Sequence, residues 1–324
     1  MRKRGGGIGH RVTPAGAPLQ SPSSVPTVLR VTQRLLAIDA GRGARAAAQA
    51  IPGAVRCVPE LGAAPASLRT LDSELIAALA ELCEVMGWIL FDAGFPRRAR
   101  RANGRALALA DLCGDRWTGR LVLLNHSMLQ AHVGRPRAAL ETAARAAGAR
   151  ALPARVGALV LIRQAHAIAM LGAASASVRR LSRARSLFLD GVSASDPPWA
   201  WWIDETELLG HQGWVLARLR RWDRAIPLLR QAAAAPGGPS YRDLFTAELF
   251  AALAGAGAWR DAEDLIRDVA PRAAGMGSVR ATESLGATAA LLRHRADAPP
   301  AVRDAAVHLL ETLSAPARRP AVRP

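Results

Sequence analysis

The sequence predicts an all-α fold made of repeated helix pairs, and three observations support this. Alanine is abundant among leucine, arginine and glutamate, a mixture that favours helix. Runs of β-branched residues are rare, and aromatic residues make up only 4% of the chain. A small residue also returns at the same place in successive helix pairs, which indicates an internal repeat.

The chain divides into five parts by composition. Residues 1–26 are rich in Gly, Pro, Ser and Arg, and we expect them to be disordered. Residues 27–67 contain one or two helices over 28–50, and then a proline-broken linker over 52–67. Residues 68–276 form the repeat array, 277–314 the closing helices, and 315–324 a disordered tail.

Apolar residues at three- and four-residue spacing place the helices of the array. The five predicted pairs are 71–93 with 96–112, 116–133 with 136–148, 154–171 with 178–189, 201–219 with 223–235, and 241–256 with 259–276. The closing helices are predicted over 279–295 and 301–314.

The second helix of each pair carries the repeat signal. Each has a small residue five positions after a turn residue, and a second small residue seven positions further on. The turn residues are Gly94, Gly134, Gly172, Arg220 and Gly257. The first small residues are Ala99, Ala139, Ser177, Ala225 and Ala262, and the second ones are Ala106, Ala146, Ala184, Ala232 and Val269. Such pairs bury their apolar faces against their neighbours.

This pattern resembles the tetratricopeptide repeat (TPR). The positions that fit it best are Gly87, Leu90, Ala99 and Ala106 in the first pair, and Gly213, Leu216, Ala225 and Ala232 in the fourth. The resemblance implies a right-handed superhelix of about five degenerate TPR-like pairs. The array departs from the family at His126 and Gln212, which take a usually apolar position, and by an insertion near 191–202.

A narrower resemblance involves the strings WILFDAG, DPPWAWWIDETEL and LFTAELFAALAGAGAWRDAEDL. They are similar to the C-terminal part of actinobacterial transcription regulators that join a helix-turn-helix to a TPR-like array. The resemblance implies the sensor part of a regulator. Residues 1–24 show no helix-turn-helix pattern, so we expect either a stand-alone array or a gene that starts upstream. DNA is an expected partner only if a helix-turn-helix is supplied elsewhere.

The formal net charge is +17, and Lys3 is the only lysine. Abundant arginine and alanine indicate a GC-rich genome, which raises the charge without selection for a polyanion. Residues 1–56 hold nine basic residues and a single acid, Asp39. This segment is either a nucleic-acid-binding arm or a solvated leader.

We expect a cytoplasmic protein that does not enter the membrane. The three cysteines, Cys57, Cys83 and Cys113, lack metal or disulfide spacing, which is typical of reduced thiols. Residues 1–20 lack the apolar core of a secretory signal. The most apolar stretch, 156–174, carries Arg163 and His166 near its centre, which favours a buried helix.

First helices line the concave face of a TPR array, so their inward residues are the candidate binding groove for a protein or peptide ligand. Arginine and asparagine could hold a carboxylate or backbone, and tryptophan could anchor apolar groups. The alternative is that these residues belong to the core. The candidates are Glu84, Trp88, Asn125, His132, Arg163, His166 and Trp214.

We expect a regulatory module without catalysis, metal or cofactor. No phosphate loop, nucleophile elbow or zinc-binding HExxH motif occurs. The expected partners are a protein or peptide ligand and a second copy of the chain in a homodimer. Two features stay open: an arginine cluster over 97–105 is a phosphate-binding stripe or a solvated face, and Trp199, Trp201 and Trp202 cap a groove or plug a seam.

Overall fold

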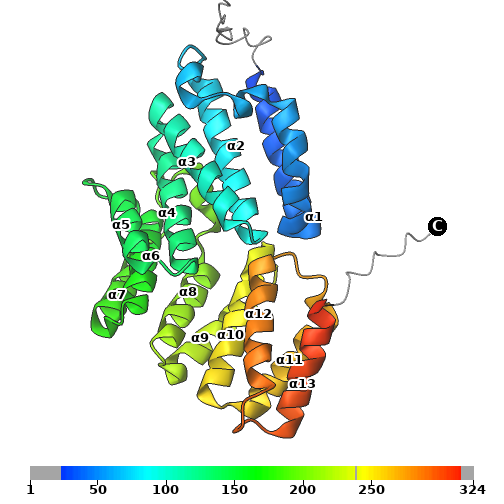
Figure 1. The fold of residues 1–324 in the computed structure, drawn as a ribbon. Coiled ribbons are helices and arrows are strands. Elements are labelled where there is room, and N and C mark those ends of the chain that lie inside the picture. Colours follow the sequence, from blue (N-terminus) through cyan, green and yellow to red (C-terminus); the bar gives the residue numbers. More distant parts are fainter. Residues whose placement is uncertain (1–22, 238, 315–324) are drawn as a thin grey trace, which may run out of the picture.

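A computed structural model describes residues 23–237 and 239–314, and this part contains thirteen α-helices, four short 3-10 segments and no strand (Figure 1). The all-α prediction is therefore confirmed for the described residues. The disorder predicted for residues 1–22 and 315–324 lies outside them. Helix α1 already begins at Val25, inside the predicted leader.

Helix α1, Val25–Cys57, extends beyond its predicted end. It breaks at Gly43, whose φ of 79° is unfavourable for residues with a side chain, and then continues through Pro52. The predicted linker over 52–67 is thus wrong in its first part, because Ala44, Ala47 and Ile51 bury an apolar face that holds the helix together. Two 3-10 turns, η1 (Pro59–Gly62) and η2 (Pro65–Leu68), complete the connection.

The remaining helices follow the predicted pairs closely. The five pairs of the array are α2 (Ser73–Asp92) with α3 (Pro96–Cys113), α4 (Arg116–His132) with α5 (Pro136–Ala147), α6 (Ala154–Met170) with α7 (Ala174–Leu189), α8 (Glu205–Arg218) with α9 (Trp222–Ala234), and α10 (Asp243–Ala256) with α11 (Trp259–Ala273). The chain closes with α12 (Val279–Leu292) and α13 (Pro300–Ser314).

Three first helices start later than predicted, and α2 begins at Ser73 rather than at 71. In contrast, the second helix α7 begins four residues earlier than predicted, at Ala174. Helix α8 begins at Glu205 rather than at 201, because the Asp204 carboxylate accepts a hydrogen bond from the Glu207 backbone N–H and caps the helix there. The tryptophans before it form the 3-10 turn η3 (Pro198–Trp202). Likewise, η4 (Ser240–Arg242) precedes α10 at Asp243.

The repeat positions adopt equivalent local structures. All five turn residues have positive φ, between 57° and 80°, and Arg220 is the only non-glycine among them. Both sets of small residues on the second helices are buried. A side chain at Gly87 would collide with Asn103, and one at Gly213 with Leu229, each sixteen residues further along the chain. The paired helices therefore approach closely at the same place in both pairs.

The pairs pack in chain order. Each first helix contacts its own second helix and the next first helix, so α2, α4, α6, α8, α10 and α12 form one continuous row. Of the clustered tryptophans, Trp199 and Trp202 are half-buried against the apolar cluster of α4 and α6, whereas Trp201 is 73% exposed.

The two ends of this row meet. In Figure 1 the lower ends of α1 and α2 lie against the upper end of α12. The Ala44 backbone N–H donates to the Gly277 carbonyl at 3.0 Å. The Asp92 Oδ1 atom accepts hydrogen bonds from Ser278 Oγ and Arg280 Nε, both at 2.8 Å. We call Asp92, Ser278 and Arg280 the clasp.

Within the described residues, every helix is either too short or too polar to cross a bilayer.

Candidate ligand cavity

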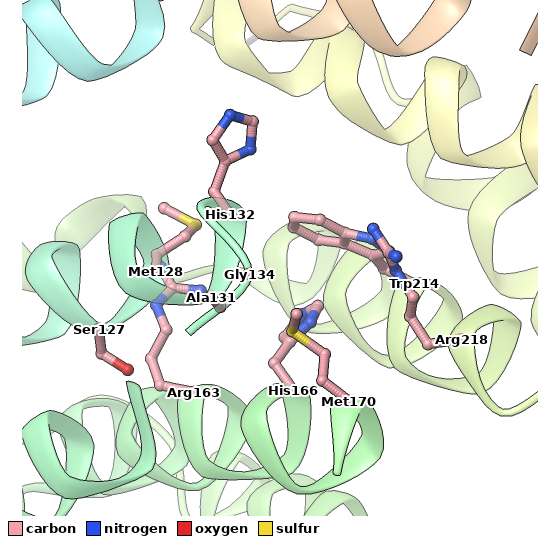
Figure 2. A pocket seen from close by; sticks show the side chains of 10 residues that line it. All are labelled: Ser127, Met128, Ala131, His132, Gly134, Arg163, His166, Met170, Trp214 and Arg218. Atoms are coloured by element: carbon pink, nitrogen blue, oxygen red, sulfur yellow. The ribbon is translucent and has the colours of Figure 1, made fainter. Parts of the chain in front are cut away.

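A cavity of about 260 Å³ lies on the inner side of the row of first helices, between α4, α6 and α8 (Figure 2). Consecutive first helices supply most of its wall, which is why residues more than 80 positions apart meet there. The lining residues are Ser127, Met128, Ala131, His132, Gly134, Arg163, His166, Met170, Trp214 and Arg218.

Arg163 is the central cation of the cavity wall. Its side chain is buried, with only 3% of the residue exposed, and its Nη1 lies 3.1 Å from His211 Nε2. Burial lowers the pKa of Arg163 to about 10, and the nearby Glu207 carboxylate opposes that shift. Its Nε has no hydrogen-bond partner among the described residues. A buried donor of this kind is costly unless an acceptor is supplied.

Two histidines connect the cavity to a carboxyl group behind it. His166 Nε2 lies 3.1 Å from His211 Nδ1, and His211 Nε2 lies 3.0 Å from Glu207 Oε1. Burial lowers the pKa of both imidazoles well below the usual value, with the neighbouring positive charges acting in the same direction. Both rings are therefore neutral near pH 7, and each carries a single N–H.

Glu207 is the last residue of this hydrogen-bonded series. Burial raises its pKa to about 7, although Arg163 and Arg242 act to lower it. Arg163 can only donate, so its hydrogen bond to His211 requires that Nε2 carries the lone pair. His211 then holds its proton on Nδ1 and donates to His166 Nε2. A protonated Glu207 is compatible with this arrangement, whereas an ionised Glu207 would need a proton on the nitrogen to which Arg163 donates.

Residues of η4 hold Glu207, at the far end of the hydrogen-bonded series, in place. The Tyr241 hydroxyl donates to Glu207 Oε2 at 3.2 Å. The Arg242 guanidinium donates to Asp204 Oδ2 at 2.8 Å, and its Nε lies 3.7 Å from Glu207 Oε2. These contacts fix the Glu207 carboxyl, and through it the orientation of His211.

Trp214 forms the apolar wall of the cavity. Its ring stacks on His211 at 5.8 Å between centroids and meets His166 edge-on at 4.4 Å. The indole Nε1–H is buried and, within the described residues, has no acceptor. Two residues of the cavity wall therefore hold a buried donor without a partner among the described residues, Arg163 at Nε and Trp214 at Nε1.

The composition of the wall defines the ligand chemistry that it fits. The exposed Arg218 adds a second cation at the cavity, and Met128 and Met170 provide flexible apolar surface. Donors and cations beside thioethers and an indole suit a carboxylate attached to an apolar group. The volume is enough for one such group rather than for a long peptide.

The structure brings four of the seven predicted groove residues together at this cavity: His132, Arg163, His166 and Trp214. The other three lie apart from it. Asn125 Nδ2 donates to Glu84 Oε1 at 2.7 Å in a buried pair. Trp88 packs edge-on against Tyr241 at 5.1 Å.

The prediction missed Glu207 and Tyr241, and it did not select His211 as a site residue. The sequence did contain a signal for the Glu207–His211 pair, because the two residues are four positions apart and therefore share one face of a helix. Tyr241 is the single tyrosine of the chain, but nothing local to it indicates that it reaches Glu207 from a different element.

No group of three or more His, Cys, Asp or Glu within residues 23–237 and 239–314 is arranged to hold a metal ion. No protein-family model matches the chain, and no curated protein matches it.

Proposed function

We propose that this chain is a non-enzymatic regulatory module, a TPR-like right-handed superhelix that binds a peptide or protein through a carboxylate placed in the cavity. The observation that carries the proposal is the pair of buried, unpartnered donors on the cavity wall, Arg163 Nε and Trp214 Nε1. A carboxylate bound beside the Arg163 and Trp214 side chains would supply the missing acceptor, and the methionines would accommodate the adjoining apolar side chain.

The repeated geometry of the pairs supports the TPR-like part of the proposal. Positive φ recurs at the five turn positions, and buried small residues follow each turn at a constant interval. Successive first helices also contact one another along the chain, a packing pattern that is typical of solenoids. The resemblance to the sensor part of a transcription regulator gives the role: a cytoplasmic array that reports ligand binding to a DNA-binding partner.

Binding acts by a population shift. The cavity is bounded by three consecutive first helices, α4, α6 and α8, so a ligand that contacts all three favours one spacing between them. Because each pair rests on the next, a changed spacing alters the curvature of the whole row. A partner that contacts several pairs senses that change.

The test uses two random tetrapeptide libraries, immobilised through their N-termini, one with free C-terminal carboxylates and one with C-terminal amides. We expect the full chain to capture free-carboxylate peptides with an apolar last residue, and to capture amides at least tenfold less. Arg163→Met removes the central donor and should abolish the preference. The matched control is Arg155→Met, on the same helix and one of the residues that do not line the cavity.

Equal capture of both libraries, or unchanged capture by Arg163→Met, would falsify the carboxylate site. Absence of any capture would also count against peptide binding at this cavity.

A further inference from the structure

The second helices of the first three pairs carry an unusual excess of positive charge. Helices α3, α5 and α7 together hold eleven arginines and two carboxylates, Asp111 and Glu141. The arginines are Arg97, Arg98, Arg100, Arg101, Arg105, Arg137, Arg145, Arg179, Arg180, Arg183 and Arg185. All but the half-buried Arg105 are exposed.

None of these eleven arginines forms a salt bridge within the described part of the chain. The residues outside that part contain no aspartate or glutamate, so no side-chain carboxylate remains there to neutralise them. Arg105 donates to the Glu60 carbonyl, and Arg98 lies over the Phe95 ring. The other nine face solvent with their charge uncompensated.

Helix α11, the second helix of the fifth pair, has the opposite character. It holds three arginines, Arg260, Arg267 and Arg272, together with four carboxylates. Arg267 pairs with Asp264 at 2.7 Å and with Glu263 at 3.0 Å. A GC-rich genome raises arginine content everywhere, so it does not explain why α11 has more carboxylates than arginines whereas α3, α5 and α7 together have far fewer.

We propose that the exposed arginines of α3, α5 and α7 bind the phosphate backbone of double-stranded DNA. Planar guanidinium groups match phosphate oxygens in bidentate geometry, and clustered cations gain affinity by releasing counterions from the duplex. In Figure 1, α5 and α7 lie together at the left edge of the molecule, away from the clasp.

A duplex fits these arginines better than a single strand does. Single-strand sites stack bases on exposed aromatic rings. Among the described residues of α3, α5 and α7 the only aromatic is Phe188, and it is half-buried. The exposed Phe95 precedes α3, but the Arg98 guanidinium lies over its ring. Contacts to phosphates position a duplex but do not read its sequence, so we expect binding without sequence preference. In these two proposals the exposed arginines bind DNA phosphates, and the cavity binds the carboxylate of a peptide or protein.

The experiment measures binding of the full chain to a fluorescein-labelled 24-base-pair duplex between 50 and 300 mM salt. The test variant is Arg179→Gln/Arg180→Gln/Arg183→Gln, on three exposed residues of α7. The matched control is Arg260→Gln/Arg267→Gln/Arg272→Gln, which removes the same number of exposed charges from α11. Circular dichroism verifies that both remain folded.

We expect the wild type to bind, with affinity falling steeply as salt rises. The α7 variant should bind at least tenfold more weakly at 50 mM salt and reduce the log–log salt slope by about 2 to 3, close to one per lost phosphate contact. The α11 variant should stay within twofold of the wild type. The same strand in single-stranded form should bind more weakly than the duplex.

Equal losses in the two variants would overturn the proposal, because they would show a general effect of net charge. Absence of duplex binding at 50 mM salt, or tighter binding of the single strand, would also overturn it. Poly-L-glutamate that competes as well as duplex DNA at equal charge would assign these arginines to an acidic protein instead. Peptide capture at the cavity is measured separately, so either proposal can fail alone.

Discussion

Two buried arginines sit on the inner side of this molecule in opposite circumstances. In the clasp, Arg280 donates from Nε to the Asp92 carboxylate at 2.8 Å, and its guanidinium lies 4.1 Å from the centre of the Phe91 ring. In the cavity wall, Arg163 contacts a neutral imidazole and forms no salt bridge with a described residue. Each guanidinium also has one buried nitrogen without a partner among the described residues, Nη2 in Arg280 and Nε in Arg163, so the carboxylate is what separates them.

The difference separates a structural arginine from one available to a ligand. Both side chains are almost completely buried, so each loses its hydration. Arg280 recovers interaction energy from a carboxylate and from two aromatic faces. Arg163 does not, and burial lowers its pKa to about 10. Removing the Asp92–Arg280 pair should lower the free energy of unfolding, whereas replacing Arg163 should weaken only ligand binding.

The largest expected effect is that of Asp92→Ala. This change leaves Arg280 buried without its carboxylate and removes the acceptor of Ser278, so the free energy of unfolding should fall by about 3–5 kcal/mol. Urea unfolding followed by circular dichroism measures it. The exposed Asp111→Ala on α3 is the control. A loss below about 1 kcal/mol for Asp92→Ala would show that the clasp does not hold the two ends together.

Glu84 extends the comparison to a buried carboxyl, which accepts a hydrogen bond from the Asn125 amide. The pH dependence of the free energy of unfolding measures what its burial costs. Burial raises the pKa of Glu84 to about 7, and the hydrogen bond from Asn125 opposes the shift. In the unfolded chain this group ionises near 4.5. As pH rises from 4.5 to 7 the unfolded state therefore releases a proton that the folded state keeps, and stability falls.

Glu84→Gln should remove this loss, because glutamine stays neutral and its Oε1 can accept the same hydrogen bond from Asn125. Thermal and urea unfolding should show little difference from the wild type near pH 4.5, and a variant more stable by on the order of 3 kcal/mol at pH 8. Glu74→Gln, at an exposed position of the same helix, should change neither value. An unchanged difference across the pH range would mean that Glu84 titrates normally in the folded chain.

Much of the fold could be predicted because its signals are local. Apolar spacing and turn residues place the pairs, and the positions aligned on Ala99 and Ala225 are buried as predicted. The errors fell where a distant contact decides the outcome. Gly43 breaks α1 where a side chain would collide with the Gly277 backbone, and no local pattern near either residue signals that contact.

The site was harder to predict for the same reason. Arg163, His166 and Trp214 were found because they occupy inward positions of regular helices. Glu84 and Asn125 occupy such positions too, but they pair with each other, and only their distance of 2.7 Å reveals this. Whether an inward polar residue is satisfied depends on neighbours about forty residues away, and a repeat register does not contain that information.

The smallest expected effect is the most informative one. Arg163→Met should leave the free energy of unfolding within about 1 kcal/mol of the wild type at pH 6. The substitution loses one hydrogen bond to His211 but also removes the cost of burying a charge that no carboxylate contacts. At pH 6 Glu207, with a pKa of about 7, is mostly protonated, so little ion-pair attraction is lost.

The same urea titration that measures Asp92→Ala measures this variant. A fall of 3 kcal/mol or more would place Arg163 in the same class as Arg280, a structural residue, and the cavity would lose its claim to a ligand. Stability near that of the wild type, together with lost peptide capture, is the combination that distinguishes a binding arginine from a structural one.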